Sequence, residues 1–140
     1  MARILPLCVI LLFLGCSKSS FSEADLHYLN GYWEISEVTF PEGAKKQYSV
    51  NPSVDFIQLE NGKGFRKKLQ PKFDGGYDAS LDVEFLTIGQ TNDVFTLQYK
   101  SEFSDWEETL VQLDSMSFAV INEEGIRYAY KRFQPIVIPK

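Results

Sequence analysis

Residues 94–101 read Val-Phe-Thr-Leu-Gln-Tyr-Lys-Ser, and this stretch determines the fold class. Its apolar residues Phe95, Leu97 and Tyr99 alternate with polar residues. A period of two places alternate side chains on opposite faces of a β-strand. A strand with one apolar and one polar face is typical of an antiparallel sheet that covers a core on one side.

The same pattern recurs along most of the chain. Val, Ile, Phe, Tyr, Trp and Thr dominate these segments, and Gly, Asn, Asp and Pro separate them. Asn61-Gly62 is the strongest hairpin signal of the chain, because this dipeptide adopts the tight turn that hairpins favour. The predicted strands span residues 32–40, 46–50, 54–60, 64–73, 81–88, 94–101, 106–113, 116–122 and 126–133.

The short connections between these strands favour an up-and-down meander. Eight or nine antiparallel strands have to hide their edges, and closure into a barrel hides them completely. The predicted fold is therefore an all-β, single antiparallel up-and-down barrel of eight or nine strands. A sandwich of two sheets is the alternative.

A short helix is predicted before the first strand. Ser22 is a helix-capping residue, and Asp25 follows it at the spacing of a capping box. Phe21 and Leu26 stand where a hydrophobic staple would form. Asn30-Gly31 ends this helix, since both residue types favour helix termini.

The N-terminus has the features of a secretory signal peptide. Arg3 precedes an apolar run over residues 5–14, and the chain becomes polar directly after Cys16. The run is too short to cross a bilayer. Residues 13–16, Phe-Leu-Gly-Cys, resemble the lipobox of bacterial lipoproteins, which implies cleavage before Cys16 and acylation of its thiol and amine.

Four segments follow from this interpretation. Residues 1–15 form the cleaved signal peptide and 16–21 an acylated tether. Residues 22–135 form the barrel domain, and 136–140 form a C-terminal tail. The tether of five residues after Cys16 spans roughly 17 Å at 3.3–3.6 Å per residue, which keeps the barrel close to the membrane.

Charge argues against nucleic acid as a partner. The formal net charge is −5, and it becomes −6 when Arg3 leaves with the signal peptide. Binding to nucleic acid requires a basic surface. An acidic domain also does not adhere broadly to anionic lipid.

The residue types of catalytic and metal sites are scarce. Cys8 leaves with the signal peptide and Cys16 is the lipid site, so the domain has neither a disulfide nor a thiolate nucleophile. His27 is the single histidine, and it is read as a surface residue of the short helix. Glu107 and Glu108 are strand neighbours that point to opposite faces, so they are read as solubilising residues. We therefore expect no catalytic residue, metal site or cofactor, and no enzyme.

Two motifs carry a family resemblance. Gly31-Tyr32-Trp33 follows the short helix, and the last strand contains Tyr-Ala-Tyr-Lys-Arg over residues 128–132. They resemble the Gly-x-Trp start and the final-strand arginine of the lipocalins, and the chain is similar to small lipocalin-like lipoproteins of Bacteroidetes-type bacteria. The resemblance implies a calycin-like barrel in which Arg132 packs across Trp33 and joins the first strand to the last.

Candidate ligand-binding residues come from the alternation. Tyr99, Tyr128 and Tyr130 have core-facing parity and polar tips, and Trp106 begins a strand at the open rim. In the segment 64–73, alternation places Phe65 and Lys67 on the apolar face and Arg66 on the opposite face. A buried Lys67 would hold a ligand headgroup, whereas at the barrel mouth it would extend to water. The full candidate set is Lys67, Phe85, Tyr99, Trp106, Tyr128 and Tyr130.

The expected function is that of a membrane-anchored binding protein. Its barrel would bury a small hydrophobic or amphiphilic molecule without covalent chemistry, and it would act as a monomer. The alternative is a structural or interaction lipoprotein with a filled barrel and a protein partner. The expected location is the bacterial cell envelope, in the outer membrane because Ser17 is not the Asp of inner-membrane retention, and facing the periplasm.

Overall fold

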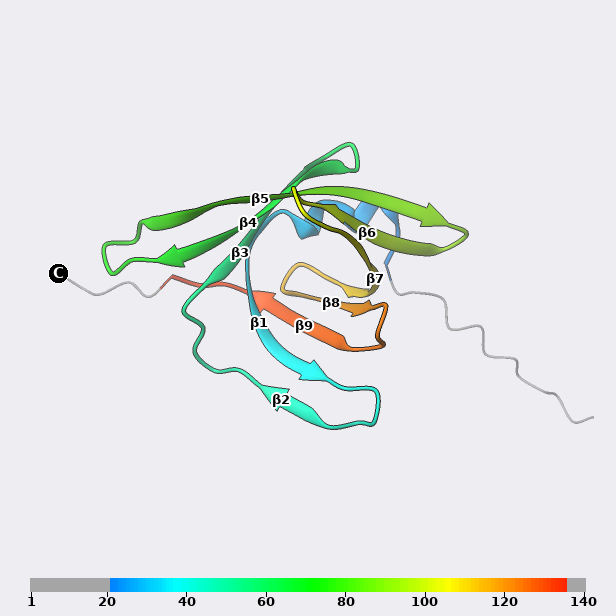
Figure 1. Cartoon of the computed structure of the whole chain (residues 1–140), viewed down its shortest axis with the longest axis horizontal. Helices are drawn as coiled ribbons and strands as arrows, with labels where there is room; N and C mark the ends of the chain where they lie inside the picture. Colours follow the sequence, from blue (N-terminus) through cyan, green and yellow to red (C-terminus); the bar gives the residue numbers. More distant parts are fainter. Residues whose placement is uncertain (1–20, 136–140) are drawn as a thin grey trace, which may run out of the picture.

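The computed structural model describes residues 21–135, with the side chains of 80 and 81 left out. The predicted signal peptide, Cys16 and the predicted tail 136–140 lie outside the described residues. Within the described residues a short 3-10 helix precedes nine strands (Figure 1). In chain order these elements are η1 (Glu23–Leu29), β1 (Gly31–Thr39), β2 (Lys45–Gln47), β3 (Val54–Glu60), β4 (Lys63–Pro71), β5 (Tyr77–Thr91), β6 (Val94–Lys100), β7 (Asp105–Leu113), β8 (Ser117–Asn122) and β9 (Arg127–Arg132).

The strands form a closed antiparallel barrel. Each strand from β3 to β9 pairs with the next one in sequence, and β1 pairs with both β3 and β9. These eight strands complete the ring, whereas β2 pairs only with the far half of β1. The predicted up-and-down barrel is confirmed, and the two-sheet sandwich is wrong because β1 and β9 pair directly.

Most strands end at the turn residues that the sequence analysis identified. Asn61 and Gly62 both have positive φ, at 52° and 77°, which is the conformation of the tight hairpin turn. Two strands differ most: β2 ends at Gln47, three residues before the expected end, and β5 begins at Tyr77, four residues before the expected start, and ends at Thr91, three residues after the expected end. The register between β4 and β5 shifts after Lys67, so a bulge interrupts the alternation in the early part of β5 and hides it from a pattern search.

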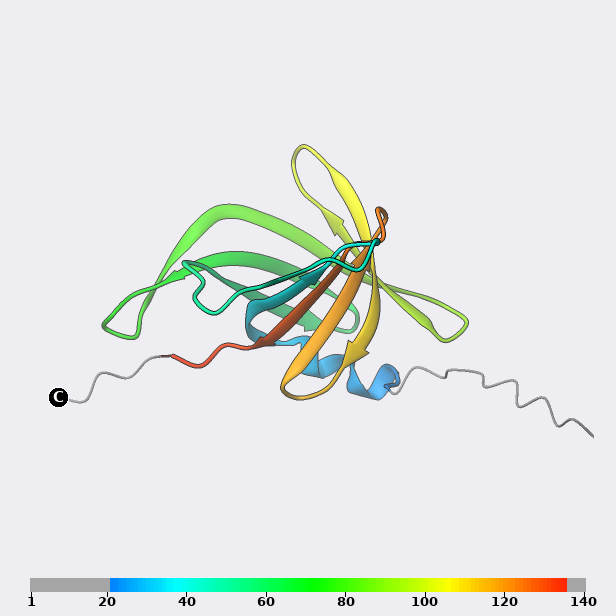
Figure 2. The same cartoon turned by 90° about the horizontal axis from the view of Figure 1, so that it is seen from below.

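The helix η1 covers one end of the barrel (Figure 2). Asp25 Oδ2 accepts a hydrogen bond from the Ser22 backbone N–H at 2.9 Å, as the capping pattern predicts. At the other end of η1, the Asn30 side chain accepts from the Leu59 N–H at 2.6 Å. The helix is therefore fixed to β3 as well as to the core.

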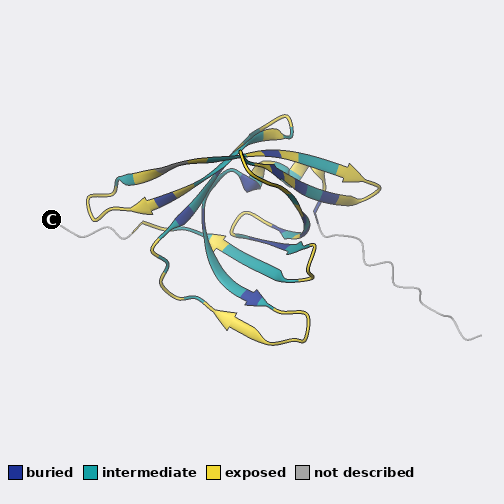
Figure 3. Ribbon diagram, viewed as in Figure 1, coloured by how far each residue is buried: buried dark blue, intermediate teal, exposed yellow. Residues whose placement is uncertain are grey.

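The core lies inside the ring and includes Leu29 of η1. Figure 3 shows buried positions on most strands of the ring, whereas β9 has none. Trp33 is fully buried, and its indole N–H donates to the Leu29 carbonyl at 2.8 Å. The buried cluster comprises Phe21, Leu29, Trp33, Ile57, Leu86, Phe95, Leu97, Tyr99, Leu110, Leu113, Phe118 and Val120.

Arg132 connects the two ends of the chain. Its guanidinium carbon lies 3.7 Å from the centroid of the Trp33 ring, the contact that the two sequence motifs predict. Its nitrogens donate to the carbonyls of Asn30 at 2.6 Å, Tyr28 at 2.8 Å and Ser115 at 3.1 Å. One side chain thus joins η1, β1 and the β7–β8 turn, and each of these bonds is charge-assisted.

Gly31 is required by this arrangement. Its φ of +119° is unfavourable for other residues. A Cβ at this position would also stand 2.5 Å from Nη1 of Arg132. The glycine therefore lets the guanidinium approach the backbone where η1 meets β1.

We expect Trp33→Ala to lower the free energy of unfolding by about 3–5 kcal/mol, the usual cost of removing a buried aromatic side chain. Equilibrium unfolding in urea, followed by circular dichroism, measures this change. Trp106→Ala is the matched control, because Trp106 is only partly buried and should cost less. An unchanged midpoint for Trp33→Ala would contradict the central place of this residue.

Candidate functional site

A charged cluster lies inside the barrel, and its centre is Arg66. In the paired strands, Arg66 stands beside Ile57 of β3 and Glu84 of β5. Ile57 is 1% exposed and belongs to the core, so Arg66 also points inward. The expectation that Arg66 faces outward is wrong.

Phe65 and Lys67 occupy the outer face instead. Phe65 pairs with Phe85, which is 64% exposed, and its ring lies 6.1 Å from that of Phe56. The Lys67 ammonium stands 5.2 Å from the Phe65 ring centroid on this same face. Lys67 and Phe85 therefore do not line the interior. The alternation pattern indicated the wrong face because β3, β4 and β5 carry aromatic residues on their outer side.

Arg66 is held by two neighbours. Its Nε donates to Glu84 Oε2 at 2.5 Å, and its Nη1 donates to the Tyr99 hydroxyl at 3.3 Å. The guanidinium carbon also lies 4.2 Å from the centroid of the Tyr99 ring. Planar stacking and directed hydrogen bonds together fix the guanidinium in the barrel.

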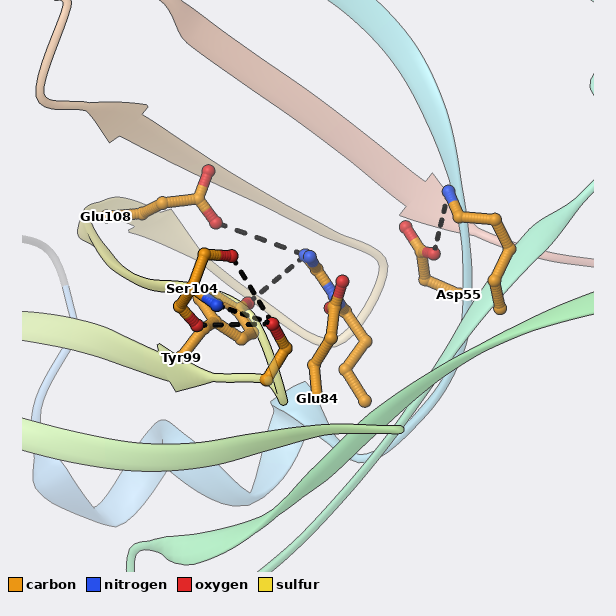
Figure 4. Close-up of polar contacts among 8 residues, drawn as sticks. Asp55, Glu84, Tyr99, Ser104 and Glu108 are labelled. Carbon is orange, nitrogen blue, oxygen red and sulfur yellow. Dashed lines mark hydrogen bonds and ion pairs between the residues drawn. The ribbon is translucent and has the colours of Figure 1, made fainter. Parts of the chain in front are cut away.

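Glu108 is the second buried charge. It is 7% exposed, and its Oε1 lies 4.0 Å from Nη1 of Arg66, which is beyond hydrogen-bond length. No residue in the described part of the chain donates a hydrogen bond to its carboxylate. Figure 4 shows Glu108, Glu84 and Tyr99 converging, with Asp55 farther away. The interpretation of Glu108 as a solubilising residue is wrong.

Burial shapes the protonation of this cluster. It raises the pKa of the Glu108 carboxyl, and the nearby Arg66 offsets this effect only in part. Burial also raises the pKa of the Tyr99 and Tyr130 hydroxyls. For Arg66, burial by itself lowers the pKa, but Tyr99 and Glu84 raise it, and the result lies above the ordinary value. Arg66 therefore stays charged, while Glu108 gains a proton more readily than an exposed glutamate.

The other predicted aromatic residues face inward. Tyr99 and Trp106 stack at 5.2 Å between ring centroids, with 17° between their planes. Tyr130 stacks on Phe118 at 4.6 Å, and Tyr128 packs against the core cluster. Of the six candidates, these four share the interior with Arg66.

A cleft of about 730 Å³ opens beside the cluster. The pairing of β5 with β6 ends at Phe85, so residues 82–84 separate there from the β6–β7 connection. Glu84 and Trp106 are lining residues that also belong to the interior. Phe85 and the 90% exposed Phe103 are lining residues at the surface. Figure 2 shows that the β6–β7 connection (yellow) and η1 (blue) stand at opposite ends of the barrel.

A second depression, of about 490 Å³, lies beside η1. His27 lines it, and its Nδ1 is 2.7 Å from the Ala24 carbonyl. Within residues 21–135, no group of three or more His, Cys, Asp or Glu side chains is placed to hold a metal ion. No helix in this part of the chain has the length and apolar character of a membrane span.

The arrangement is suited to binding. Three aromatic residues, Phe85, Phe103 and Trp106, line the cleft together with charged and polar residues, and Glu84 connects it to the charged cluster. Sequence reasoning named Tyr99, Trp106, Tyr128 and Tyr130, which face the interior, but it missed Arg66, Glu84 and Glu108. The pairing of Arg66 with Glu84 across two strands is a signal, since opposite charges are favoured at facing positions. The bulge in β5 obscures this pairing.

Replacing Glu108 with Gln should raise the stability of the barrel at neutral pH. Its pKa is higher in the folded than in the unfolded state, so the charged form destabilises the fold. The advantage of the variant should be full above the folded-state pKa and disappear as pH falls below about 4.3, the ordinary value for Glu. Thermal unfolding across this range measures it, with exposed Glu107→Gln as the control. A variant less stable than the wild type at pH 8 would contradict the assigned cost of burial.

Comparisons with known proteins add little to this geometry. No family model matches the chain, and no curated protein matches it. Among solved structures, an uncharacterized protein from Bacteroides eggerthii DSM 20697 is similar, with a TM-score of 0.48 and 13% sequence identity. The similarity covers 75% of this chain and 99% of the other. At this level it carries no argument about family or function.

Proposed function

We propose that the protein is a lipid-anchored, lipocalin-like binding module of the bacterial cell envelope. It holds a small amphiphilic molecule at the open end of its barrel and performs no covalent chemistry. The observation that carries the proposal is the cleft beside the β6–β7 connection, which combines aromatic lining with an adjacent charged cluster. An amphiphile needs both surfaces.

The two parts of such a molecule have separate places. Phe85 and Phe103 offer exposed apolar surface at the entrance, and Trp106 continues that surface inward. Glu84 marks the polar side, where it binds Arg66. Burying an alkyl chain contributes about 0.8 kcal/mol per methylene group, so a short chain suffices for measurable affinity.

The proposed binding site is shallow. Trp33, Leu97 and Phe118 are at most 3% exposed and belong to one buried cluster that includes Leu29 of η1. A deep apolar cavity reaching η1 is therefore not part of the proposal. The ligand remains near the entrance and exchanges there.

The proposed lipid anchor is supported by the sequence alone. The lipobox-like residues before Cys16 support acylation, and several acyl chains make membrane attachment effectively permanent. The Gly31, Trp33 and Arg132 arrangement supports the likeness to lipocalins. The proposed location is the outer membrane, with the barrel on the periplasmic side.

An interaction protein is the second candidate. Phe73 is 92% exposed at the β4–β5 connection, and Phe103 is 90% exposed at the β6–β7 connection. Exposed aromatic residues are enriched in protein interfaces. If the protein is an interaction protein, a partner protein would bind the β4–β5 and β6–β7 connections, and the barrel would have no site for a small molecule.

A binding titration separates the two candidates. Residues 17–140 contain the complete ring and its described core, so this segment is a suitable soluble protein. We expect at least one of octylamine, octanoate and octan-1-ol to bind and to change tryptophan fluorescence. Trp106→Ala should weaken that binding about tenfold, the effect of losing a well-packed aromatic contact.

Phe73→Ala is the control, since it removes an exposed aromatic side chain outside the cleft. Binding by calorimetry replaces fluorescence for the Trp106 variant. If none of the three probes binds the wild type, the ligand-binding proposal fails and the interaction protein is favoured.

The anchor has its own test in the full chain. After expression in a bacterium fed an alkyne-bearing palmitate, the wild type should carry the label and sediment with membranes. Cys16→Ser should lose the label and enter the soluble fraction, because serine has no thiol to acylate. Cys8→Ser should behave as the wild type. A labelled Cys16→Ser variant would disprove acylation at Cys16.

A further inference from the structure

We infer that the molecule bound in the barrel carries a protonated amine and that the Glu108 carboxylate receives it. This inference deepens the proposed function and rests on it. Its starting point is a buried carboxylate that accepts no hydrogen bond from any residue between 21 and 135. The residue is 7% exposed, and among the described residues no fully buried side-chain oxygen or nitrogen lacks a hydrogen-bond partner, so the Glu108 carboxylate keeps some contact with solvent and a donor from solution can reach it.

Arg66 does not supply that donor. Its Nε is bonded to Glu84, and its Nη1 is directed to the Tyr99 hydroxyl. The remaining 4.0 Å from Nη1 to Glu108 is an electrostatic contact without a hydrogen bond. When Glu108 is ionised, both of its carboxylate oxygens can only accept hydrogen bonds, so the donors come from water or from a ligand that displaces it.

The surrounding charges favour a cation. The groups that influence Glu108 are Arg66 of β4, Glu84 of β5 and Asp55 of β3. Asp55 is itself paired with Lys68 at 3.5 Å. Arg66 is bonded to Glu84 and Asp55 is paired with Lys68, so Glu108 has only the longer 4.0 Å ion pair with Arg66. An anionic group at this position would meet two glutamates at close range.

Aromatic faces complete the environment. Tyr99 and Trp106 form a stacked pair on β6 and β7, and Glu108 follows Trp106 by two residues on the same face of β7. Ammonium groups bind favourably to aromatic faces, and Trp is the strongest partner. A primary amine here would donate to Glu108 while its first methylene groups contact Trp106. Its alkyl chain would extend through the cleft toward Phe85 and Phe103.

The same geometry makes binding depend on pH. Burial raises the pKa of Glu108, and a protonated carboxyl no longer attracts an ammonium group. Arg66 and the amine keep their charges across the acidic range, and the raised pKa values of Tyr99 and Tyr130 keep both hydroxyls neutral. Affinity should therefore fall as pH decreases through the titration of Glu108.

The test compares three probes of equal chain length by calorimetry on residues 17–140. Octylammonium should bind at least about tenfold more tightly than octanoate or octan-1-ol at pH 7.5. Glu108→Gln should weaken octylammonium binding by about 10- to 100-fold, the range for a charge-assisted hydrogen bond. Glu107→Gln removes the same charge from the neighbouring residue on the outer face and should leave binding unchanged.

The wild type provides a second measurement that needs no variant. Its affinity for octylammonium should decrease as pH is lowered from 7.5 to 4.5, while affinity for octan-1-ol stays constant. Equal or tighter binding of octanoate or octan-1-ol would overturn the inference and leave the proposed function standing. Equal losses in Glu107→Gln and Glu108→Gln, or no effect of pH, would also overturn it. If no probe binds, the proposed function itself fails.

Discussion

The structure depends on the contact between Trp33 and Arg132. The guanidinium lies over the indole and bonds to three carbonyls, so the first strand, the last strand and η1 are held at one point. This contact accompanies direct pairing of β1 with β9, which removes the two edges of the meander. Only in a closed ring do the inward side chains of β4, β5 and β7 face one another, and the charged cluster needs that arrangement.

The barrel interior contains an apolar cluster and a charged cluster in contact with each other. The apolar cluster supplies the hydrophobic stabilisation of the fold. Arg66, Glu84 and Glu108 adjoin it through Tyr99, and their desolvation opposes folding. Unfavourably placed ionisable groups concentrate at functional sites, which is why this cluster is the candidate site.

The sequence predicted the closed ring of strands, but it did not predict the charged cluster around Arg66. The Asn61-Gly62 turn fixes the pairing of β3 with β4, and Gly31, Trp33 and Arg132 mark the closure. On β4, however, both faces contain apolar residues or lysine stems, so alternation does not reveal which face is inside. Because Phe65 is apolar, the outer face of β4 has the sequence pattern expected of an inner face. Glu108 was misassigned for a related reason, because a carboxylate next to another carboxylate on a strand is usually exposed.

The separation of Arg132 from its partners along the chain affects how the protein folds. The bond to Asn30 joins residues 102 positions apart, so the ring closes only when almost the whole chain is available. Contacts of such long range slow folding, since the entropy of a large loop is lost before the contact forms. If the chain is exported as proposed, late closure would keep the polypeptide unfolded during translocation. Pairing of the last strand would then be the step that completes the native state after the chain has crossed the membrane.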